Sequence, residues 1–338
     1  MAEMLMEYAL FLAKVVTIVV AIGLTVTVIV ASARRERMPE KLEVKHLNKR
    51  YESMASTLRK ETLTKKAFKA HRKQEKAHKK AEKKLEKSAG DGSHPCVFVL
   101  NFHGDIKATA VNTFREEVTA VLLLAKPDDE VVVRLENAGG LVHDHGLAAS
   151  QLMRIKEKRI PITIMVDKVA ASGGYMMACV ADRILAAPFA VIGSIGVLAQ
   201  LPNFHRLLDK HGIDVEQFMA GEFKRTVTLF GRNSDEGRTK LKEELEDTHL
   251  LFKDFVTTHR PAVEIERVAT GEHWYGARAL ELKLVDGLMT SDEYLLDASQ
   301  RAEVYEVIFT GKRSVTQRVA SMMKQALVQR LTRGRNAL

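Results

Sequence analysis

The 338-residue chain is longer than one average domain requires, and its net charge is +9. The charge is local, because residues 34–90 hold 20 Lys and Arg against 8 Asp and Glu while the remainder is slightly acidic. The basic pI is therefore no evidence that the folded body binds nucleic acid or other acidic partners. Cys96 and Cys179 are too few for a disulfide framework, and we expect free thiols, with Cys179 packed inside a helix.

An uncharged run from Val15 to Ser32 is long enough to span a bilayer core. A cleaved signal peptide is the alternative, but its first residues should be basic. Here two glutamates precede the run and three arginines follow it: Glu3, Glu7, Arg34, Arg35 and Arg37. We expect residues 1–33 to form an uncleaved single-pass anchor in a bacterial inner membrane. Because Lys and Arg are retained inside, these charges favour a cytoplasmic body, with a periplasmic body as the alternative.

Residues 34–93 are rich in Lys, Glu and Ala and poor in apolar residues, which predicts a solvated, basic helical spacer. Its end, residues 88–93, has the composition of a linker. Contact with anionic lipid headgroups is the functional alternative to a plain spacer. No stacking aromatic residues accompany the basic stretch, so we expect no nucleic-acid partner.

The body that follows alternates strands and helices, which predicts an α/β fold with a largely parallel sheet. The expected strands are 97–102, 130–135 and 162–166, and the expected helices are 108–124, 146–156, 175–180 and 234–259. An apolar run at 184–199 is interrupted by Pro188, Gly193 and Gly196. It is expected to form short buried strands rather than a second membrane span. Catalytic groups in such folds gather at the carboxyl ends of the strands.

Two glycine-rich turns at these strand ends could support catalysis. Ser172 stands at the corner of D-K-V-A-A-S-G-G-Y, where Gly173 and Gly174 let the backbone turn tightly and present N–H groups to a substrate carbonyl. The earlier turn Asn137-Ala138-Gly139-Gly140 could supply the other half of an oxyanion hole. Each turn also has a plain structural explanation, which is a helix cap for the serine and an ordinary turn for the glycines.

A single lysine, Lys224, lies in the loop A-G-E-F-K-R-T and could turn inward. A lysine acts as a general base only when it is neutral, and neutrality at ordinary pH requires desolvation. Arg225 cannot substitute for it, because a guanidinium stays charged. His143 and His145 form an H-x-H pair just after the glycine turn, which is more typical of an exposed polar turn than of a metal site.

Four segments together resemble the signal peptide peptidase A family of serine proteases: D-K-V-A-A-S-G-G-Y, G-S-I-G-V, A-G-E-F-K-R-T and T-G-E-H-W-Y-G-A-R-A-L-E-L-K-L-V-D. The resemblance covers roughly residues 94 to 295, and the anchor and spacer resemble the membrane-anchored branch of the family. It implies a ClpP/crotonase-like fold of repeated ββα units around a twisted sheet. It also implies a Ser/Lys dyad, with neither a metal nor another cofactor.

The resemblance implies a role for six residues. They are Ser172 as nucleophile, Lys224 as general base, Ser194 as a supporting residue that orients the lysine, and the backbone N–H groups of Gly173 and of Gly140 or Gly139 as oxyanion donors. One departure is visible, because the family commonly has Ser-Pro where this chain has Asn137-Ala138. A proline would preset φ, so its loss is expected to loosen the turn.

The sequence therefore predicts a membrane-anchored serine endopeptidase that works through an acyl-enzyme, with the peptidase domain at residues 94–300. Residues 301–338 are expected to form a basic amphipathic tail that docks on a partner protomer or on the membrane surface. The resemblance also implies a homo-oligomer in which Ser172 and Lys224 come from adjacent protomers. A crotonase-type acyl-CoA enzyme is one alternative, although it has no use for this pair. A catalytically silent membrane scaffold is the other.

Overall fold

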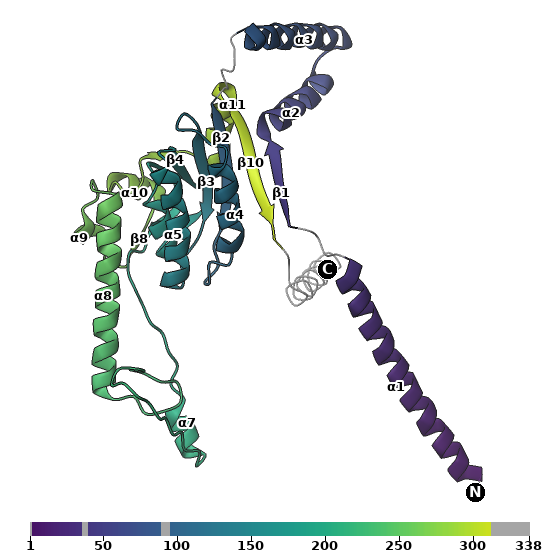
Figure 1. Cartoon of the computed structure of the whole chain (residues 1–338), viewed down its shortest axis with the longest axis vertical. Coiled ribbons are helices and arrows are strands. Elements are labelled where there is room, and N and C mark those ends of the chain that lie inside the picture. Colours follow the sequence, from purple (N-terminus) through teal and green to yellow (C-terminus); the bar gives the residue numbers. More distant parts are fainter. Residues whose placement is uncertain (1, 36–39, 89–94, 312–338) are drawn as a thin grey trace. The chain divides into compact units, whose positions relative to one another are not determined.

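The computed structural model describes residues 2–35, 40–88 and 95–311 (Figure 1). The chain divides into two units, one of Met1–Leu42 with Phe309–Leu338 and the other of Glu43–Ile308. Every candidate site residue belongs to the second unit. Most of the predicted tail, from residue 312 onward, lies outside the described residues.

The first unit contains a 34-residue helix, α1 (Ala2–Arg35). At 1.5 Å per residue it is about 51 Å long, which exceeds the roughly 30 Å core of a bilayer. Its window Met6–Gly23 has a mean hydropathy of 1.9 and no buried residues, and α1 is the one helix in the described part of the chain with the length and composition of a membrane span. The expected anchor therefore has a helix that could form it.

The second unit is built on a seven-stranded sheet with the order β1-β10-β2-β3-β4-β6-β9. Its central strands pair in parallel, as expected, and their side chains are almost completely buried, which explains their Val- and Ile-rich sequences. The strands are β1 (Lys41–His46), β2 (Cys96–His103), β3 (Glu130–Glu136), β4 (Ile162–Val166), β6 (Arg183–Ala186), β9 (Gly287–Leu288) and β10 (Glu303–Thr310).

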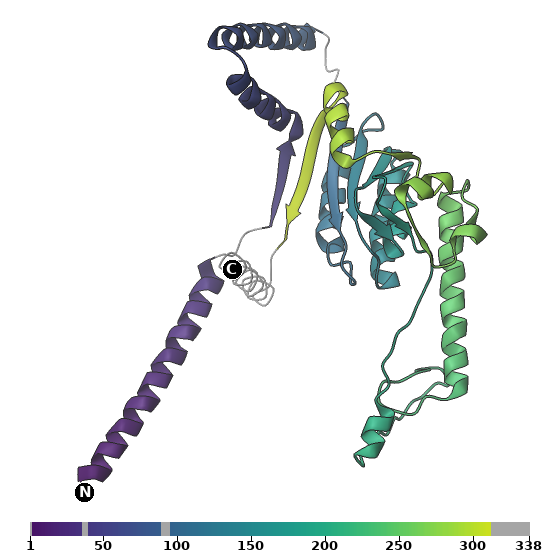
Figure 2. The ribbon, with the colours of Figure 1, turned by 180° about the vertical axis from the view of Figure 1, so that it is seen from behind.

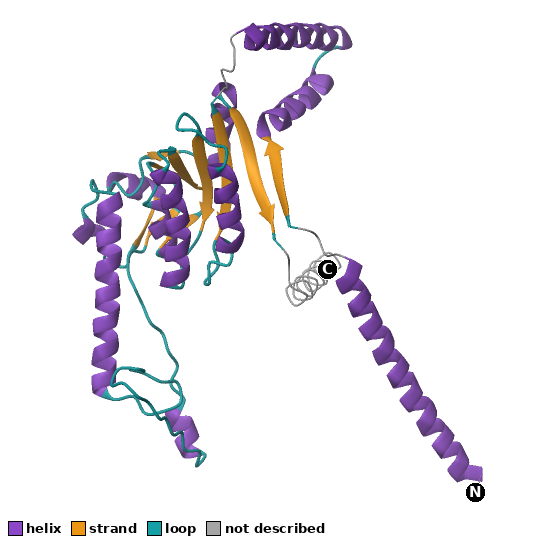
Figure 3. Ribbon diagram, in the orientation of Figure 1, coloured by secondary structure: helices purple, strands orange, loops and turns teal. Residues whose placement is uncertain are grey.

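Helices cover both faces of this sheet. On one face, α4 (Val111–Leu122), α5 (Val142–Glu157) and α6 (Gly173–Ala178) cover the sheet (Figures 1 and 3) and enclose the larger core. In this core the rings of Phe102 and Phe114 pack edge to face, with their centroids 5.3 Å apart. On the other face, α2 (Leu47–Thr62) and α11 (Ser291–Arg301) pack over a smaller core. The predicted helices at 108–124, 146–156 and 175–180 are thus confirmed within a few residues.

The predicted spacer requires a correction. Lys41–His46 form strand β1 of the main sheet instead of a helix, and the following Leu47 is buried. Asn48 fastens α2 to the body, because its amide donates to the carbonyls of Ser299 and Ala302 and accepts from the N–H of Val304. The charges of K-L-E-V-K-H suit an exposed edge strand, where they discourage further strand pairing. The solvated, charged helix that we expected is α3 (Lys65–Ser88).

The predicted start of the tail is also wrong. Residues Glu303–Thr310 form β10, which lies between β1 and β2 and pairs in parallel with β2. The burial of its residues alternates from Glu303 to Glu306, which is the period of a strand. The folded body therefore extends past residue 301.

A smaller, three-stranded sheet has the order β5-β7-β8 and carries Ser172. Its strands are β5 (Val169–Ala171), β7 (Val191–Gly193) and β8 (His273–Tyr275). The sequence suggested that the strand ending at Val166 leads into the serine, but β5 stands between them. Strands β6 and β7 confirm that the apolar run 184–199 contains short buried strands.

Residues 198–231 form an arm, defined here as the segment between β7 and α8 that extends away from the sheet beside the N-terminal end of α8 (Figures 1 and 2). It contains α7 (His205–Lys210). A hydrogen bond from the N–H of Phe204 to the carbonyl of Leu229 joins the start of α7 to the end of the arm. Helix α8 (Asp235–His259) has Ser234 as its N-cap, whose hydroxyl accepts from the N–H of Gly237. The remaining helices are α9 (Ile265–Val268) and α10 (Gly276–Glu281).

Candidate active site

Ser172 lies between the end of β5 and the start of α6, in a conformation that serine rarely adopts. Its φ is 52° and its ψ is −120°, and its N–H donates to the carbonyl of Gly193 at 2.8 Å. The side chain is half-buried and makes no capping hydrogen bond, so the helix-cap explanation fails. A non-glycine residue held at positive φ is strained, and such residues cluster at functional sites.

The backbone N–H groups that follow Ser172 are available to a ligand. The first bond of the helix runs from the N–H of Met176 to the carbonyl of Ser172 at 3.0 Å. The N–H groups of Gly173 and its two successors therefore have no partner within the helix. This is the arrangement that an oxyanion donor at Gly173 requires.

The structure brings the two glycine turns together. A short bridge pairs Asn137 with Ala170, and a Cβ built on Gly139 would lie 2.7 Å from the Cβ of Ser172 and 2.8 Å from the nitrogen of Gly173. Gly139 has a φ of 90°, which a side chain would strain. A glycine is thus required there by both the backbone and the available space.

The two candidate donors in the first turn differ in their hydrogen bonds. The N–H of Gly139 donates to Oδ1 of Asn137 at 2.9 Å. The N–H of Gly140 makes no hydrogen bond to any residue that the structure describes. A Cβ on Gly140 would lie 2.1 Å from the carbonyl oxygen of Ile106, so this residue also sits in a space that only glycine fits.

Ser194 lies next to Ser172, because it follows β7, the strand that pairs with β5. It also has a positive φ, 50°, and its N–H donates to the carbonyl of Glu272 at 2.7 Å. Its hydroxyl is 3.4 Å from the carbonyl oxygen of Gly271. The Ser194 hydroxyl donates toward this carbonyl, and its oxygen keeps a lone pair that could accept a hydrogen bond from a lysine amine.

Lys224 is not brought to Ser172 within one chain. It is exposed in the arm, where its N–H donates to the carbonyl of Gly221 at 3.2 Å. Its amine makes no hydrogen bond or ion pair with any described residue. A single copy therefore holds the serine, its strained turn and the glycines in place, and it leaves the lysine in solvent.

The H-x-H pair divides into two unlike residues. Both lie in the first turn of helix α5 and not in a loop, and His143 is exposed, with its Nε2 3.7 Å from Oδ2 of Asp144. His145 instead is completely buried, so the expectation of an exposed turn is wrong for it. Its Nε2 lies 3.1 Å from Oδ1 of Asn137, and its Nδ1 lies 2.9 Å from the carbonyl oxygen of Leu141. Within the described residues, no cluster of three potential ligands could hold a metal ion.

Comparison with known proteins identifies the family. Residues 3–152 match the model of the peptidase family S49 N-terminal region, and residues 154–305 match that of peptidase family S49. A probable protease SohB of Haemophilus influenzae is 46% identical over 334 residues, which cover 96% of this chain and 95% of that protein. The chain belongs to peptidase family S49, in its SohB-type branch.

Two further comparisons extend this result. A probable protease SohB of Buchnera aphidicola subsp. Schlechtendalia chinensis is 44% identical over 303 residues, covering 87% of this chain and 99% of that one. Among solved structures, a 1510-N membrane-bound stomatin-specific protease covers 69% of this chain and 99% of its own at 14% identity, with a TM-score of 0.42. The family assigns the chain peptidase activity, and the acyl-CoA alternative is not favoured.

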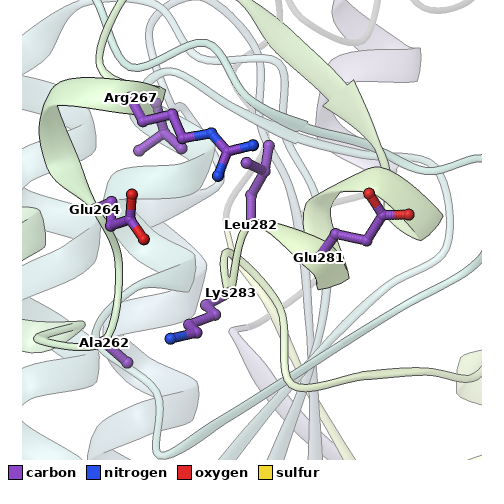
Figure 4. Close-up of a pocket in the computed structure, with 7 residues that line it drawn as sticks. Ala262, Glu264, Arg267, Glu281, Leu282 and Lys283 are labelled. Carbon is purple, nitrogen blue, oxygen red and sulfur yellow. The ribbon is translucent and has the colours of Figure 1, made fainter.

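Two cavities of this S49 chain are lined by residues other than the predicted site residues. One of about 20 Å³, with room for about one water, is lined by Glu264, Arg267 and Lys283 among others (Figure 4). A larger one of about 310 Å³ is lined by polar residues whose charges are already paired, for example Lys168 with Glu136 at 3.0 Å. None of the predicted site residues lines either cavity.

The two cysteines do not offer a rival nucleophile. No disulfide joins Cys96 and Cys179, as expected, and Cys179, at the carboxyl end of α6, is buried in the core. Burial raises the pKa of the Cys179 thiol to about 12, so it is not a thiolate near neutral pH. Burial also raises the pKa of Tyr175, whose hydroxyl donates to the carbonyl of Leu284 at 2.9 Å.

Proposed function

We propose that this chain is a membrane-anchored serine endopeptidase in which Ser172 is the nucleophile and Lys224 the general base. The observation that carries the proposal is the corner at Ser172. There a hydroxyl without a hydrogen-bond partner among the described residues is held at positive φ, beside unpaired N–H groups of two glycine turns. Strain of this kind is maintained only where the surrounding structure enforces it.

The reaction proceeds in two halves. Oγ of Ser172 attacks the carbonyl carbon of the scissile bond while its proton passes to the neutral amine of Lys224. The negative charge that develops on the carbonyl oxygen is stabilised by the N–H groups of Gly173 and Gly140. We favour Gly140 over Gly139, because the N–H of Gly139 is already bonded to Asn137. The lysine then gives its proton to the leaving amine, and water hydrolyses the acyl-enzyme by the same steps.

The lysine comes from a neighbouring copy in this proposal. Within one chain Lys224 is exposed, and the arm that carries it displays apolar side chains to solvent, among them Leu198, Phe204 and Phe218. Exposed apolar surface of this extent is typical of a contact with another protein. Packing of the arm against an adjacent protomer in a closed homo-oligomer would bury these residues and desolvate the lysine. Ser194 would then be placed to accept a hydrogen bond from its amine.

Mixing inactive variants tests the shared site. Chains with Ser172→Ala and chains with Lys224→Ala are each expected to be inactive, whereas mixed oligomers would pair an intact serine with an intact lysine at some interfaces. Partial recovery of activity in mixed oligomers is the expected result. If oligomers verified to contain both chains show no recovery, the shared dyad is wrong.

Activity-based labelling distinguishes a peptidase from a catalytically silent scaffold. A fluorophosphonate probe applied to the full chain in membranes should label the wild type and leave Ser172→Ala unlabelled. Failure of the wild type to react would favour the scaffold.

Helix α1 anchors the enzyme in a bacterial inner membrane in this proposal, and the substrates are signal peptides or other membrane-associated polypeptides. Arginines follow the uncharged run Val15–Ser32 and glutamates precede it, so the positive-inside rule favours a catalytic body in the cytoplasm. Protease digestion of right-side-out spheroplasts tests this orientation. A body that resists external protease fits the cytoplasmic placement, and one that is degraded lies in the periplasm.

A further inference from the structure

Two buried polar side chains lie directly under the candidate site, and the proposed reaction does not use them. Asn137 is 1% exposed and His145 is 0% exposed. Buried polar groups persist when their hydrogen bonds are satisfied, and a satisfied network rigidifies its surroundings. Nothing in the sequence pattern distinguishes these two residues, because their pairing appears only in the folded chain.

Asn137 joins the first glycine turn to the strand that carries the serine. Its N–H donates to the carbonyl of Val169 at 2.9 Å, and its carbonyl accepts from the N–H of Ala171 at 3.0 Å, so its backbone is bonded to both ends of β5. Its side-chain Oδ1 accepts from the N–H of Gly139 at 2.9 Å, which closes an Asx turn. One residue thus fixes the orientation of the turn relative to Ser172.

His145 fixes the side chain of Asn137 and supports the second glycine turn. Its Nε2 lies 3.1 Å from the same Oδ1, which also accepts from the N–H of Gly139. Its ring packs against Gly173, where an added Cβ would lie 2.4 Å from Cγ of the histidine. An added Cβ on Gly174 would lie 2.1 Å from the carbonyl oxygen of Asn137. Both glycine turns therefore contact the same buried pair, Asn137 and His145.

We infer that Asn137 and His145 are positioning residues that hold the oxyanion hole in shape. Oδ1 of Asn137 binds the N–H of Gly139 and so leaves the neighbouring N–H of Gly140 for the substrate. His145 prevents the amide from rotating and keeps Gly173 at a fixed distance from the first turn. This inference rests on the proposed function, since it concerns the donors that Ser172 would use.

The pair also compensates for the proline that the turn lacks. Gly139 has the φ expected at the third position of a type II turn, and proline is common at the second position, where this chain has Ala138. A proline restrains the turn covalently, whereas the Asx hydrogen bond restrains it through a side chain. Ala138 is exposed and its N–H bonds to no described residue, so a proline there would remove no hydrogen bond. The expectation of a looser turn is replaced by that of a turn held by Asn137.

The labelling rate of Ser172 by a fluorophosphonate probe tests this inference in the full-length chain in membranes. Measured against probe concentration, it gives the maximal rate, kinact, and the probe affinity, KI, separately. Asn137→Ala should lower kinact about 10²-fold, the effect of losing one oxyanion donor, and change KI less than about twofold. Asn137→Asp, which keeps an oxygen acceptor, should stay within about threefold of the wild type. The double variant Asn137→Ala with Ala138→Pro should have a kinact at least about tenfold higher than that of Asn137→Ala alone.

A matched control separates positioning from stability. Gln151 is buried to a similar degree on the same helix as His145, and its amide bonds within that helix. Gln151→Ala should lower the melting temperature and leave kinact unchanged. If Asn137→Ala does not fold, His145→Gln, which can donate to Asn137, should label faster than His145→Phe, which cannot.

The outcomes separate this inference from the proposed function. A wild type that does not label overturns the proposed function and the inference with it. A labelled wild type with equally fast labelling of Asn137→Ala, or of His145→Phe where that pair is used, overturns the inference alone. Slow labelling of Asn137→Ala without recovery by the added proline also overturns it, because the asparagine would then act by some means other than restraining the turn.

Discussion

Replacing Gly139 by alanine tests how closely the two glycine turns must approach each other. The new Cβ would lie 2.7 Å from the Cβ of Ser172, whereas carbon atoms in contact are ordinarily about 3.5–4.0 Å apart. Relief requires the turns to separate by about 1 Å, and a misplacement of that size can cost about 10²-fold in rate. Alanine at the φ of 90° also costs about 1–2 kcal/mol. We expect kinact to fall about 10²-fold and the chain to lose a few kcal/mol of stability, as is typical of overpacking combined with strain.

Gly146→Ala is the matched control for this substitution. Gly146 lies seven positions further along the chain, inside α5, and an added Cβ there would meet nothing within 4 Å. An alanine in a helix interior is favoured over glycine by about 1 kcal/mol, so this variant should be slightly more stable and label at the wild-type rate. Labelling by fluorophosphonate and thermal unfolding of both variants give the comparison. Wild-type labelling by Gly139→Ala would show that the turns need not approach as the structure has them.

Three further variants or conditions test other parts of the proposal. Lys224→Arg should abolish labelling without changing the melting temperature, because arginine cannot supply a neutral base; substantial turnover would refute the dyad. Because burial raises the pKa of Cys179 from 9.0 to about 12, its contribution to stability is present below pH 9 and is lost as pH rises toward 12. The melting temperature of Cys179→Ala should therefore fall less over that pH range than the melting temperature of the wild type. An equal fall in both would contradict the raised pKa of Cys179. Phe218 is 89% exposed in the arm, and Phe218→Glu should disrupt oligomers and activity together. Leu123 is 84% exposed outside the arm, and Leu123→Glu should affect neither. Intact oligomers of Phe218→Glu in light scattering would argue against the arm as the interface.

The central elements could be predicted from the sequence because their patterns are local. Strand β4 is a short, mostly apolar run rich in β-branched residues, and α8 follows the N-cap Ser234 and has acidic residues in its first turn, which are standard signals. Strand β1 was missed because its charged residues lie within a basic stretch, where only pairing with the sheet makes a strand. The three-residue β5 is too short for any period to be visible.

The candidate site was predictable only in part, for the same reason. Ser172 and the glycines are recognised by their spacing and by the need for a tight turn. The support beneath them is not, because Asn137 and His145 become partners only when the turn after β3 folds onto the first turn of α5. A buried asparagine and an exposed one look alike in a single sequence. The contrast between His143 and His145, two residues apart and opposite in burial, shows how little local composition decides.

The two halves of the proposed dyad differ in how they are held, and this difference has a functional consequence. An oxyanion hole stabilises charge only if its donors are already in place, so the serine half needs the rigid support that β5, Asn137 and His145 provide. A lysine base needs desolvation instead, which an exposed loop of one chain cannot supply. If a neighbour's arm supplies Lys224, burial of that arm creates the base and completes the site in the same event. An unassembled chain would then carry a fully formed oxyanion hole and still be unable to acylate, so that proteolysis would be confined to the assembled enzyme.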